Sequence, residues 1–288
     1  MEILEFMLTP FVASILLIGV CVYFGIHVIK REIIFIDIAL AQVAALGTTV
    51  AVVIHNSISK SHADHDHDES NMFTYLISLL FCTLAAFIFS LLKNKKIRIP
   101  LEALIGIAYA IATTAAVIIL DKSAGSDVHV HDMLVGTLLW VTWAQVIRLL
   151  IVIVIVGLFH YIFRKKFLSL SDNYLKNNGE KMKKSALWDF SFYFSFGIVI
   201  IEAVSVGGIL TVFAFLIIPA SISALFATTW TSRILIGLSV GAIVTFLGLY
   251  FSWIMDIPCS PAIIMFLGIC LLVGIVIRKI KILRIKKN

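Results

Sequence analysis

The feature that most constrains this chain is its series of apolar stretches of eighteen or more residues. A bilayer core about 30 Å thick takes roughly 20 helical residues to cross, so each stretch is long enough for one transmembrane helix. The composition agrees, because 61% of the 288 residues are hydrophobic and only 14% are charged. A soluble domain is nearer half apolar and a quarter charged. The unbroken stretches also exclude an outer-membrane barrel, whose strands are short and alternate in polarity.

We therefore predict an all-α fold, a polytopic transmembrane helical bundle that occupies residues 1–288 as a single transmembrane domain. Nine spans are expected, at residues 8–29, 33–54, 73–92, 101–120, 145–163, 187–204, 207–228, 233–253 and 260–277. The count falls to eight if the pair Gly207-Gly208 lies inside one long broken helix. Small residues recur every fourth position in the second and fourth spans, which favours close helix contacts and predicts that these two spans lie at the centre of the bundle.

The basic residues predict how the spans are oriented. With the N-terminus outside and the C-terminus in the cytoplasm, 20 of the 23 Lys and Arg residues fall in five cytoplasmic segments, which are 30–31, 93–98, 164–184, Arg233 and 278–287. This is the distribution that the positive-inside rule requires. A nucleic-acid surface would gather its basic residues on one face, so we expect the lipid bilayer, and no nucleic acid, as a partner.

The predicted outer side is rich in groups that bind borderline divalent metals. The loop 55–71 contains the tract HADHDHDE, in which imidazoles and carboxylates suit zinc. We expect this tract to be exposed and largely unstructured from His62 to Glu69, and its candidate ligands are His62, Asp64, His65, Asp66 and His67. The alternative is a loop that is polar only because it is solvated, since a His-rich tract indicates metal binding only by composition.

A second outer segment carries another candidate set, His129, His131 and Asp132. A polar turn in which Asp132 caps the following helix explains the same residues. Within the spans, Asp37 lies about one turn inside the cytoplasmic end of the second, and Glu202 lies near an outer end. A buried carboxylate in a span is costly and usually faces a polar path or a partner. We favour a functional role for Asp37, and the alternative is a polar contact with a neighbouring helix or with water. Asp37, Gln42 and Glu202 are included among the candidate metal residues.

The sequence contains no nucleotide-binding or hydrolytic motif, such as GxxxxGK[ST], GxSxG or HExxH. We therefore expect no enzymatic activity in this chain. If it transports actively, the energy comes from another subunit or from an ion gradient.

Five segments, taken in order along nearly the whole chain, resemble a known family. They are Arg31–Gly47, LEALIGIAYAIA from Leu101, HDMLVGTLLWVT from His131, GGILTVFAFLIIPA from Gly207 and GLYFSWIMDIPCSPAIIM from Gly248. Together they are similar to ABC transporter family 3, the membrane permease subunits of zinc, manganese and iron importers. One departure concerns the second span, where the family often has a carboxylate and an imidazole one turn apart. Here Gln42 takes the imidazole position and Asp37 stands one residue too early, so a pair of pore ligands is not carried over.

The resemblance implies a permease that pairs with a second copy of itself in a bacterial plasma membrane. It also implies two cytoplasmic ATPase subunits and an extracytoplasmic solute-binding protein that delivers a divalent metal. The metal would be cargo, zinc before manganese or iron, and ATP would bind to the partner subunit, so this chain holds no cofactor of its own. A stand-alone secondary metal carrier and a non-transporting sensor remain as alternatives.

The family's ATPase-coupling helix corresponds to the segment from Ala220 to Arg233, which the basic residues also place on the cytoplasmic side. Pro219 is expected to end the preceding helix, because proline lacks an amide donor and clashes with the previous turn. A separate short helix should follow, with an apolar face toward the ATPase. The coupling candidates are Pro219, Ala220, Ser223, Leu225, Phe226, Trp230 and Arg233.

Overall fold

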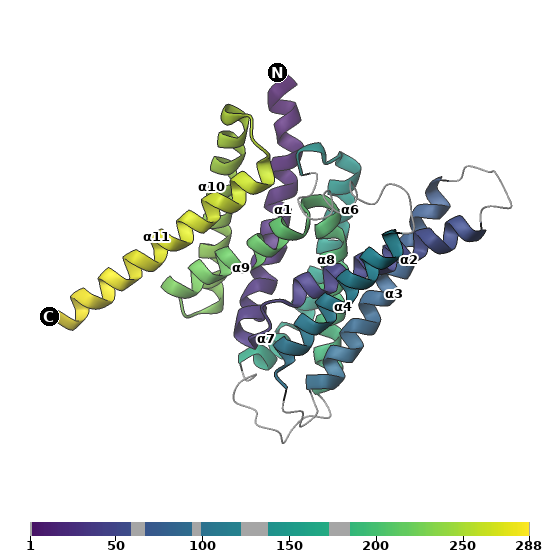
Figure 1. Ribbon diagram of the computed structural model, residues 1–288. Helices are drawn as coiled ribbons and strands as arrows, with labels where there is room; N and C mark the ends of the chain where they lie inside the picture. Colours follow the sequence, from purple (N-terminus) through teal and green to yellow (C-terminus); the bar gives the residue numbers. More distant parts are fainter. Residues whose placement is uncertain (1, 59–66, 94–98, 122–137, 173–184, 288) are drawn as a thin grey trace. The chain divides into compact units, whose positions relative to one another are not determined.

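The computed structural model describes residues 2–58, 67–93, 99–121, 138–172 and 185–287. In these residues the chain is helical and contains no strand (Figure 1). The helices are α1 (Glu2–Arg31), α2 (Ile36–Ile58), α3 (His67–Lys93), α4 (Leu101–Asp121), the 3-10 turn η2 (Leu138–Trp140), α6 (Trp143–Ile162), α7 (Arg164–Asp172), α8 (Ser185–Gly207), α9 (Ile209–Phe226), α10 (Trp230–Met255) and α11 (Cys259–Lys287).

All of these α-helices except α7 are long and apolar enough to cross a membrane, which gives nine candidate spans in the described residues. The all-α fold and the count of nine predicted from the sequence are confirmed. The count is nine rather than eight because α8 ends at Gly207 and α9 begins at Ile209.

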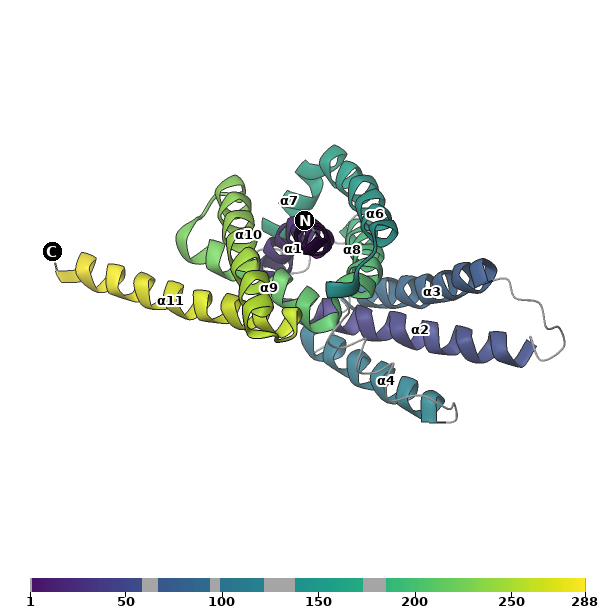
Figure 2. The same cartoon turned by 90° about the horizontal axis from the view of Figure 1, so that it is seen from above.

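The chain forms two compact units, each built from separate stretches of sequence. Unit 1 consists of Met1–Arg31, His131–Phe159 and Glu202–Asn288, and unit 2 consists of Glu32–Val130 and His160–Ile201. In unit 1, α1 packs against α9 and α10, and α11 packs against both of these. In unit 2, α2 packs between α3 and α4, and Figure 2 shows the three helices side by side.

Within unit 1, α1 and α10 run antiparallel. Phe11, near the start of α1, contacts Phe246 in the second half of α10, with ring centroids 6.1 Å apart. At the other end of α1, the ring of His27 lies 4.6 Å from that of Trp230, the first residue of α10. Successive spans are expected to cross the membrane in alternating directions. The antiparallel packing agrees with this expectation, because α1 is the first and α10 the eighth candidate span.

Two glycines on α10 allow the close approach to α1. A methyl group added at Gly237 would lie 2.6 Å from Cγ1 of Val22, and one added at Gly241 would lie 2.6 Å from Cγ2 of Ile18. The GxxxG pattern of α10 is therefore a helix-packing face, as such patterns usually are in membrane helices.

The contact between α1 and α9 is closer still. A Cβ atom added at Gly25 would overlap the backbone carbonyl oxygen of Leu216 and would lie 3.0 Å from Cβ of Ala220. Toward the other end of α1, a Cβ at Gly207 would lie 3.1 Å from Cδ1 of Leu17. The two helices run parallel, so they cross in the same direction.

Unit 2 uses small side chains and side-chain hydrogen bonds between α2 and α3. A Cβ added at Gly47 would lie 2.8 Å from Cα of Ser78. The Ser78 hydroxyl donates to the carbonyl oxygen of Ala44 at 2.8 Å, and the Cys82 thiol points at the Leu40 carbonyl oxygen at 3.8 Å. In hydrocarbon, where water is absent, such bonds satisfy polar groups that would otherwise be unpaired.

The prediction that the second and fourth spans form the centre of the bundle is wrong for the fourth. Burial within the chain reaches 67% of the most apolar window of α1 and 61% of that of α8, but only 17% of that of α4. On α4, Ala112 and Ala116 are buried, whereas Ala110 and Thr114 are exposed. Small-residue spacing signals that a face is suited to close packing, but it does not say which helix covers that face.

Candidate functional site

A glycine separates α8 from α9. Gly208 has φ 75° and ψ 161°, a backbone conformation that residues other than glycine rarely adopt. Its amide donates to the Val204 carbonyl at 2.9 Å, and its carbonyl accepts from the Val212 amide at 3.1 Å. The helical hydrogen bonds therefore continue on both sides of the break, and only one residue is needed for the chain to change direction.

Helix α9 passes through Pro219 without ending there, which corrects the predicted helix break. The helix continues to Phe226, and the Ala227 amide closes it by donating to the Ser223 carbonyl at 2.9 Å. Proline removes the one hydrogen bond that its missing amide would have made. Membrane helices tolerate this loss when the proline is packed against other helices, and Pro219 is buried.

The predicted separate coupling helix is also absent from the described residues, because Ala220–Phe226 belong to α9 and Trp230–Arg233 to α10. Only residues 227–229 connect the two helices. The Arg233 guanidinium donates from Nε to the Ala227 carbonyl at 3.0 Å, and the Thr229 hydroxyl donates to Oγ of Ser232 at 2.9 Å. These hydrogen bonds stabilise a short connection between α9 and α10. The structure has this connection where a surface helix was expected.

The coupling candidates at this connection differ in how far their side chains are exposed. Ala220 and Ser223 are buried, and Leu225 is half-buried, whereas 42% of the Phe226 side chain is exposed. Trp230 is half-buried by its own chain, because it lies against the ring of His27 and beneath Lys30, whose Nζ is 4.0 Å from the ring centroid. Sequence reasoning did not single out His27 and Lys30, since their partner is some two hundred residues away.

Asp37 is the second residue of α2, nearer the helix end than predicted. Its side chain is 2% exposed. Atom Oδ1 has no partner. A carboxylate in the first turn is stabilised by the positive end of the helix dipole, so α2 itself supports this group.

Gln42 is buried on the same helix, five residues further on. At 3.6 residues per turn, such a pair is separated by about 140° around the helix axis and does not share a face. Glu202, on α8, is 7% exposed and interacts electrostatically with Arg148 of α6. In the described ranges no three His, Cys, Asp or Glu side chains come together as a metal site.

The remaining metal candidates lie almost entirely outside the described residues. These are His62, Asp64, His65, Asp66, His129, His131 and Asp132. His67 is described as the first residue of α3, so the tract is helical from His67 through Glu69. This corrects the expectation of an unstructured loop up to Glu69.

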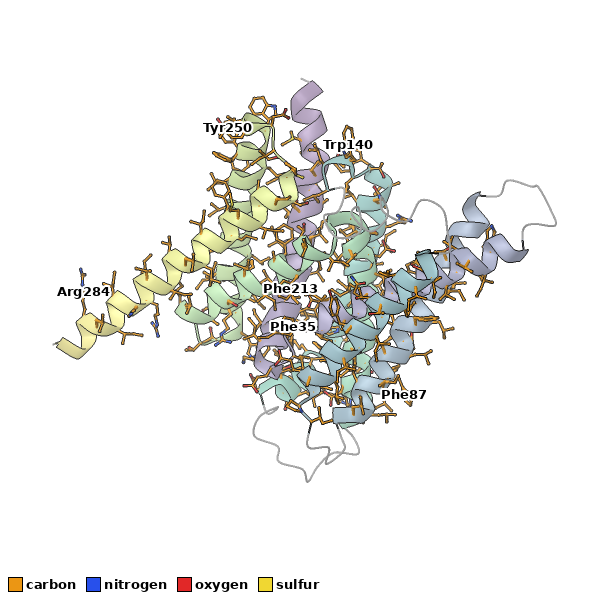
Figure 3. All side chains as sticks on the ribbon, viewed as in Figure 1. Phe35, Phe87, Trp140, Phe213, Tyr250 and Arg284 are labelled. Carbon is orange, nitrogen blue, oxygen red and sulfur yellow. The ribbon has the colours of Figure 1, made fainter. Side chains whose placement is uncertain are left out.

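The outward faces of the helices are apolar. Large hydrophobic side chains that are exposed include Phe87 on α3, Trp140 on η2 and Tyr250 on α10 (Figure 3). A soluble protein rarely exposes so much contiguous apolar surface. The fold and its surface therefore define a multi-pass helical membrane protein.

The family follows from the sequence. The model of the ABC 3 transport family matches residues 3–278, and the chain belongs to this family. "Manganese transport system membrane protein MntC" of Listeria monocytogenes is 30% identical over 176 residues, which cover 60% of this chain and 61% of the relative. "Probable metal transport system membrane protein" of Chlamydia muridarum is 23% identical over 180 residues, covering 62% and 60%. The chain thus spans about three fifths of the length of the curated relatives it matches.

The fold has a counterpart among solved structures. The structure described as PsaBC from Streptococcus pneumoniae in complex with Fab matches with a TM-score of 0.71 at 19% identity, over 93% of this chain and 90% of that one. At this level of identity the likeness establishes the fold.

Proposed function

We propose that this chain is the membrane-spanning permease subunit of an ATP-driven importer of divalent metal ions in a bacterial plasma membrane. The observation that carries the proposal is the family match over residues 3–278, on a chain with nine candidate spans. The names of the Listeria and Chlamydia relatives supply metal as the substrate class. The metal is cargo, and the chain holds no resident cofactor.

In this proposal ATP is hydrolysed on a separate cytoplasmic ATPase, so the chain itself is not an enzyme. A second copy of the chain completes the pore, and an extracytoplasmic binding protein delivers the metal. The test is reconstitution into vesicles together with a candidate cytoplasmic ABC ATPase. Metal uptake that requires ATP on the side of the membrane where the ATPase is bound supports the proposal. Metal uptake driven by a proton or sodium gradient without ATP would establish a secondary carrier.

For ATPase docking, Phe226 is the strongest of the coupling candidates. It is an exposed aromatic side chain at the end of α9, beside the tight connection of residues 227–229. Exposed aromatic anchors dominate many protein interfaces. Phe226→Asp should abolish copurification of the ATPase and stop uptake, while the permease dimer persists. Phe226→Leu, which keeps an apolar anchor, is the matched control and should retain most of the ATPase.

Two observations bear on the metal. The outer tract HADHDHDE favours zinc, because imidazole and carboxylate together suit this ion. The name of the Listeria relative favours manganese, whose sites use more oxygen ligands. We propose zinc as the first cargo to test, in competition with manganese and iron. Deleting residues 62–66 should weaken zinc uptake when zinc is scarce and leave uptake unchanged when zinc is abundant; an equal loss at all concentrations would show that the tract is structural.

A further inference from the structure

The short helix α7 is held against the start of α8 by aromatic packing. The α7 residue Phe167 is fully buried and stacks on His160 at the end of α6, with centroids 4.1 Å apart and planes 8° from parallel. Phe167 also meets Trp188 of α8 edge to face at 5.7 Å. The His160 ring is fixed in turn, since its Nε2 lies 2.8 Å from Oγ of Ser195. All these residues belong to unit 2, so the position of α7 on α8 is set within one compact unit.

The first turn of α7 carries three consecutive exposed cations, Arg164, Lys165 and Lys166. Two of them lie over aromatic rings. The guanidinium carbon of Arg164 is 5.1 Å from the centroid of Tyr161, and Nζ of Lys166 is 4.3 Å from that of Trp188. Cation–π contacts of this kind orient a charge without neutralising it. The cations therefore stay available to an anion while their side chains are partly ordered.

Exposed apolar side chains adjoin the cations. Tyr161 and Ile162, the last residues of the α6 span, are 66% and 63% exposed, and Leu187, near the start of the α8 span, is 70% exposed. Phe163 alone separates α6 from α7, so the cations follow directly on the end of a membrane span. They are thus tethered to headgroup depth, where Tyr and Trp side chains also concentrate.

We propose that the first turn of α7, together with Tyr161 and Trp188, is a binding site for the phosphate of an anionic phospholipid. The cations contact the headgroup, and the exposed Tyr161, Ile162 and Leu187 contact its acyl chains. A phosphate takes charge-assisted hydrogen bonds from arginine and lysine. A docking site for a soluble protein would not need exposed Ile162 and Leu187 at the ends of the flanking spans, whereas a lipid has both a charged and an apolar part to match.

The test is the binding of short-chain phosphatidylglycerol to the full-length detergent-solubilised protein, followed by native mass spectrometry. Each basic side chain near an anionic leaflet strengthens binding by about fivefold. Replacing all three cations, with Arg164→Gln, Lys165→Gln and Lys166→Gln, should therefore raise the Kd for phosphatidylglycerol on the order of 100-fold. The matched control replaces Arg278, Lys279 and Lys281 of α11 with Gln, which removes the same charge from another exposed helix end and should leave the tight binding in place.

Three further arms make the result decisive. A variant with Arg164→Lys, Lys165→Arg and Lys166→Arg keeps the charge and should bind nearly as the unmodified chain does, which shows that these positions tolerate substitution when the charge is kept. Phosphatidylcholine and free inorganic phosphate should bind far more weakly than phosphatidylglycerol. Equal binding of phosphatidylcholine, or unchanged phosphatidylglycerol binding in the Gln variant, would overturn the proposal. So would loss of a copurifying ATPase from that variant with lipid binding intact, because the patch would then be a protein-docking surface.

Discussion

Adding one methyl group at Gly25 should separate α1 from α9. The new Cβ would overlap the backbone carbonyl oxygen of Leu216 and would lie 3.0 Å from Cβ of Ala220. A carbonyl oxygen cannot rotate away as the tip of a side chain can, so the helices themselves must move apart. Relief at Ala220 alone, by Ala220→Gly, should not rescue the variant, because the overlap with the Leu216 oxygen remains.

The size of the effect follows from two opposing contributions to the free energy of unfolding. Overpacking a well-packed core costs about 1–3 kcal/mol, and a backbone clash belongs at the upper end of that range. Replacing a helical glycine by alanine gains about 0.5–1 kcal/mol. We expect Gly25→Ala to be destabilised by about 2 kcal/mol.

Gly19 provides the matched control, because it lies on the same helix and a Cβ added there would have no atom within 4 Å. Gly19→Ala should therefore show only the stabilisation of about 0.5–1 kcal/mol that alanine gives in a helix. The free energies of unfolding of the two variants should then differ by about 3 kcal/mol. The assay is the apparent Tm of the purified protein in detergent. At about 2–4 °C per kcal/mol for a chain of a few hundred residues, the Tm values should differ by roughly 6–12 °C.

Equal Tm values for Gly25→Ala and Gly19→Ala would refute the close packing of α1 on α9. A fall in Tm for both variants would mean that both faces of α1 are crowded, which contradicts the open space at Gly19.

Three further substitutions test other parts of the structure. Gly208→Ala should lower stability by about 1–3 kcal/mol, because φ 75° with ψ 161° is strained for any residue with a Cβ; a neutral Tm would contradict the glycine break. Ser78→Ala should cost about 0.6 kcal/mol, the typical value of a side-chain hydrogen bond between membrane helices, through loss of its bond to Ala44, and hydrogen exchange near Ala44 is the measurement. Asp37→Asn should impair reconstituted metal uptake while the protein still assembles; normal uptake would leave Asp37 as a residue that only supports the start of α2.

Much of the fold was predictable because hydrocarbon imposes strong rules on a sequence. Nine spans follow from the length and polarity of the apolar stretches, and their alternation agrees with α1 and α10 running antiparallel. The GxxxG spacing of α10 coincides with close helix packing at Gly237 and Gly241. These features depend on local composition and on the spacing of residues along one helix, which a sequence displays directly.

The errors share a different cause, which is dependence on contacts between distant residues. Pro219 was expected to end its helix, but burial among other helices compensates for one missing hydrogen bond. Trp230 stays a coupling candidate, but its contacts with His27 and Lys30 join residues some two hundred positions apart, which the sequence alone does not display. The sequence predicts no pair of metal ligands on α2, because the spacing of Asp37 and Gln42 places them on different faces. The tract HADHDHDE lies largely outside the described residues.

The two-unit organisation has a consequence for how the chain is made. Unit 2 gathers α2, α3 and α4 from neighbouring sequence, so these helices meet their partners soon after synthesis. In unit 1, α1 is made first, but its partners α9 and α10 come from the stretch that begins at Glu202. At 5–20 residues per second, a ribosome needs on the order of 10–40 s to reach them. During that interval the glycine face of α1 at Gly25 is without α9, and a chaperone or insertase in the membrane has time to shield it.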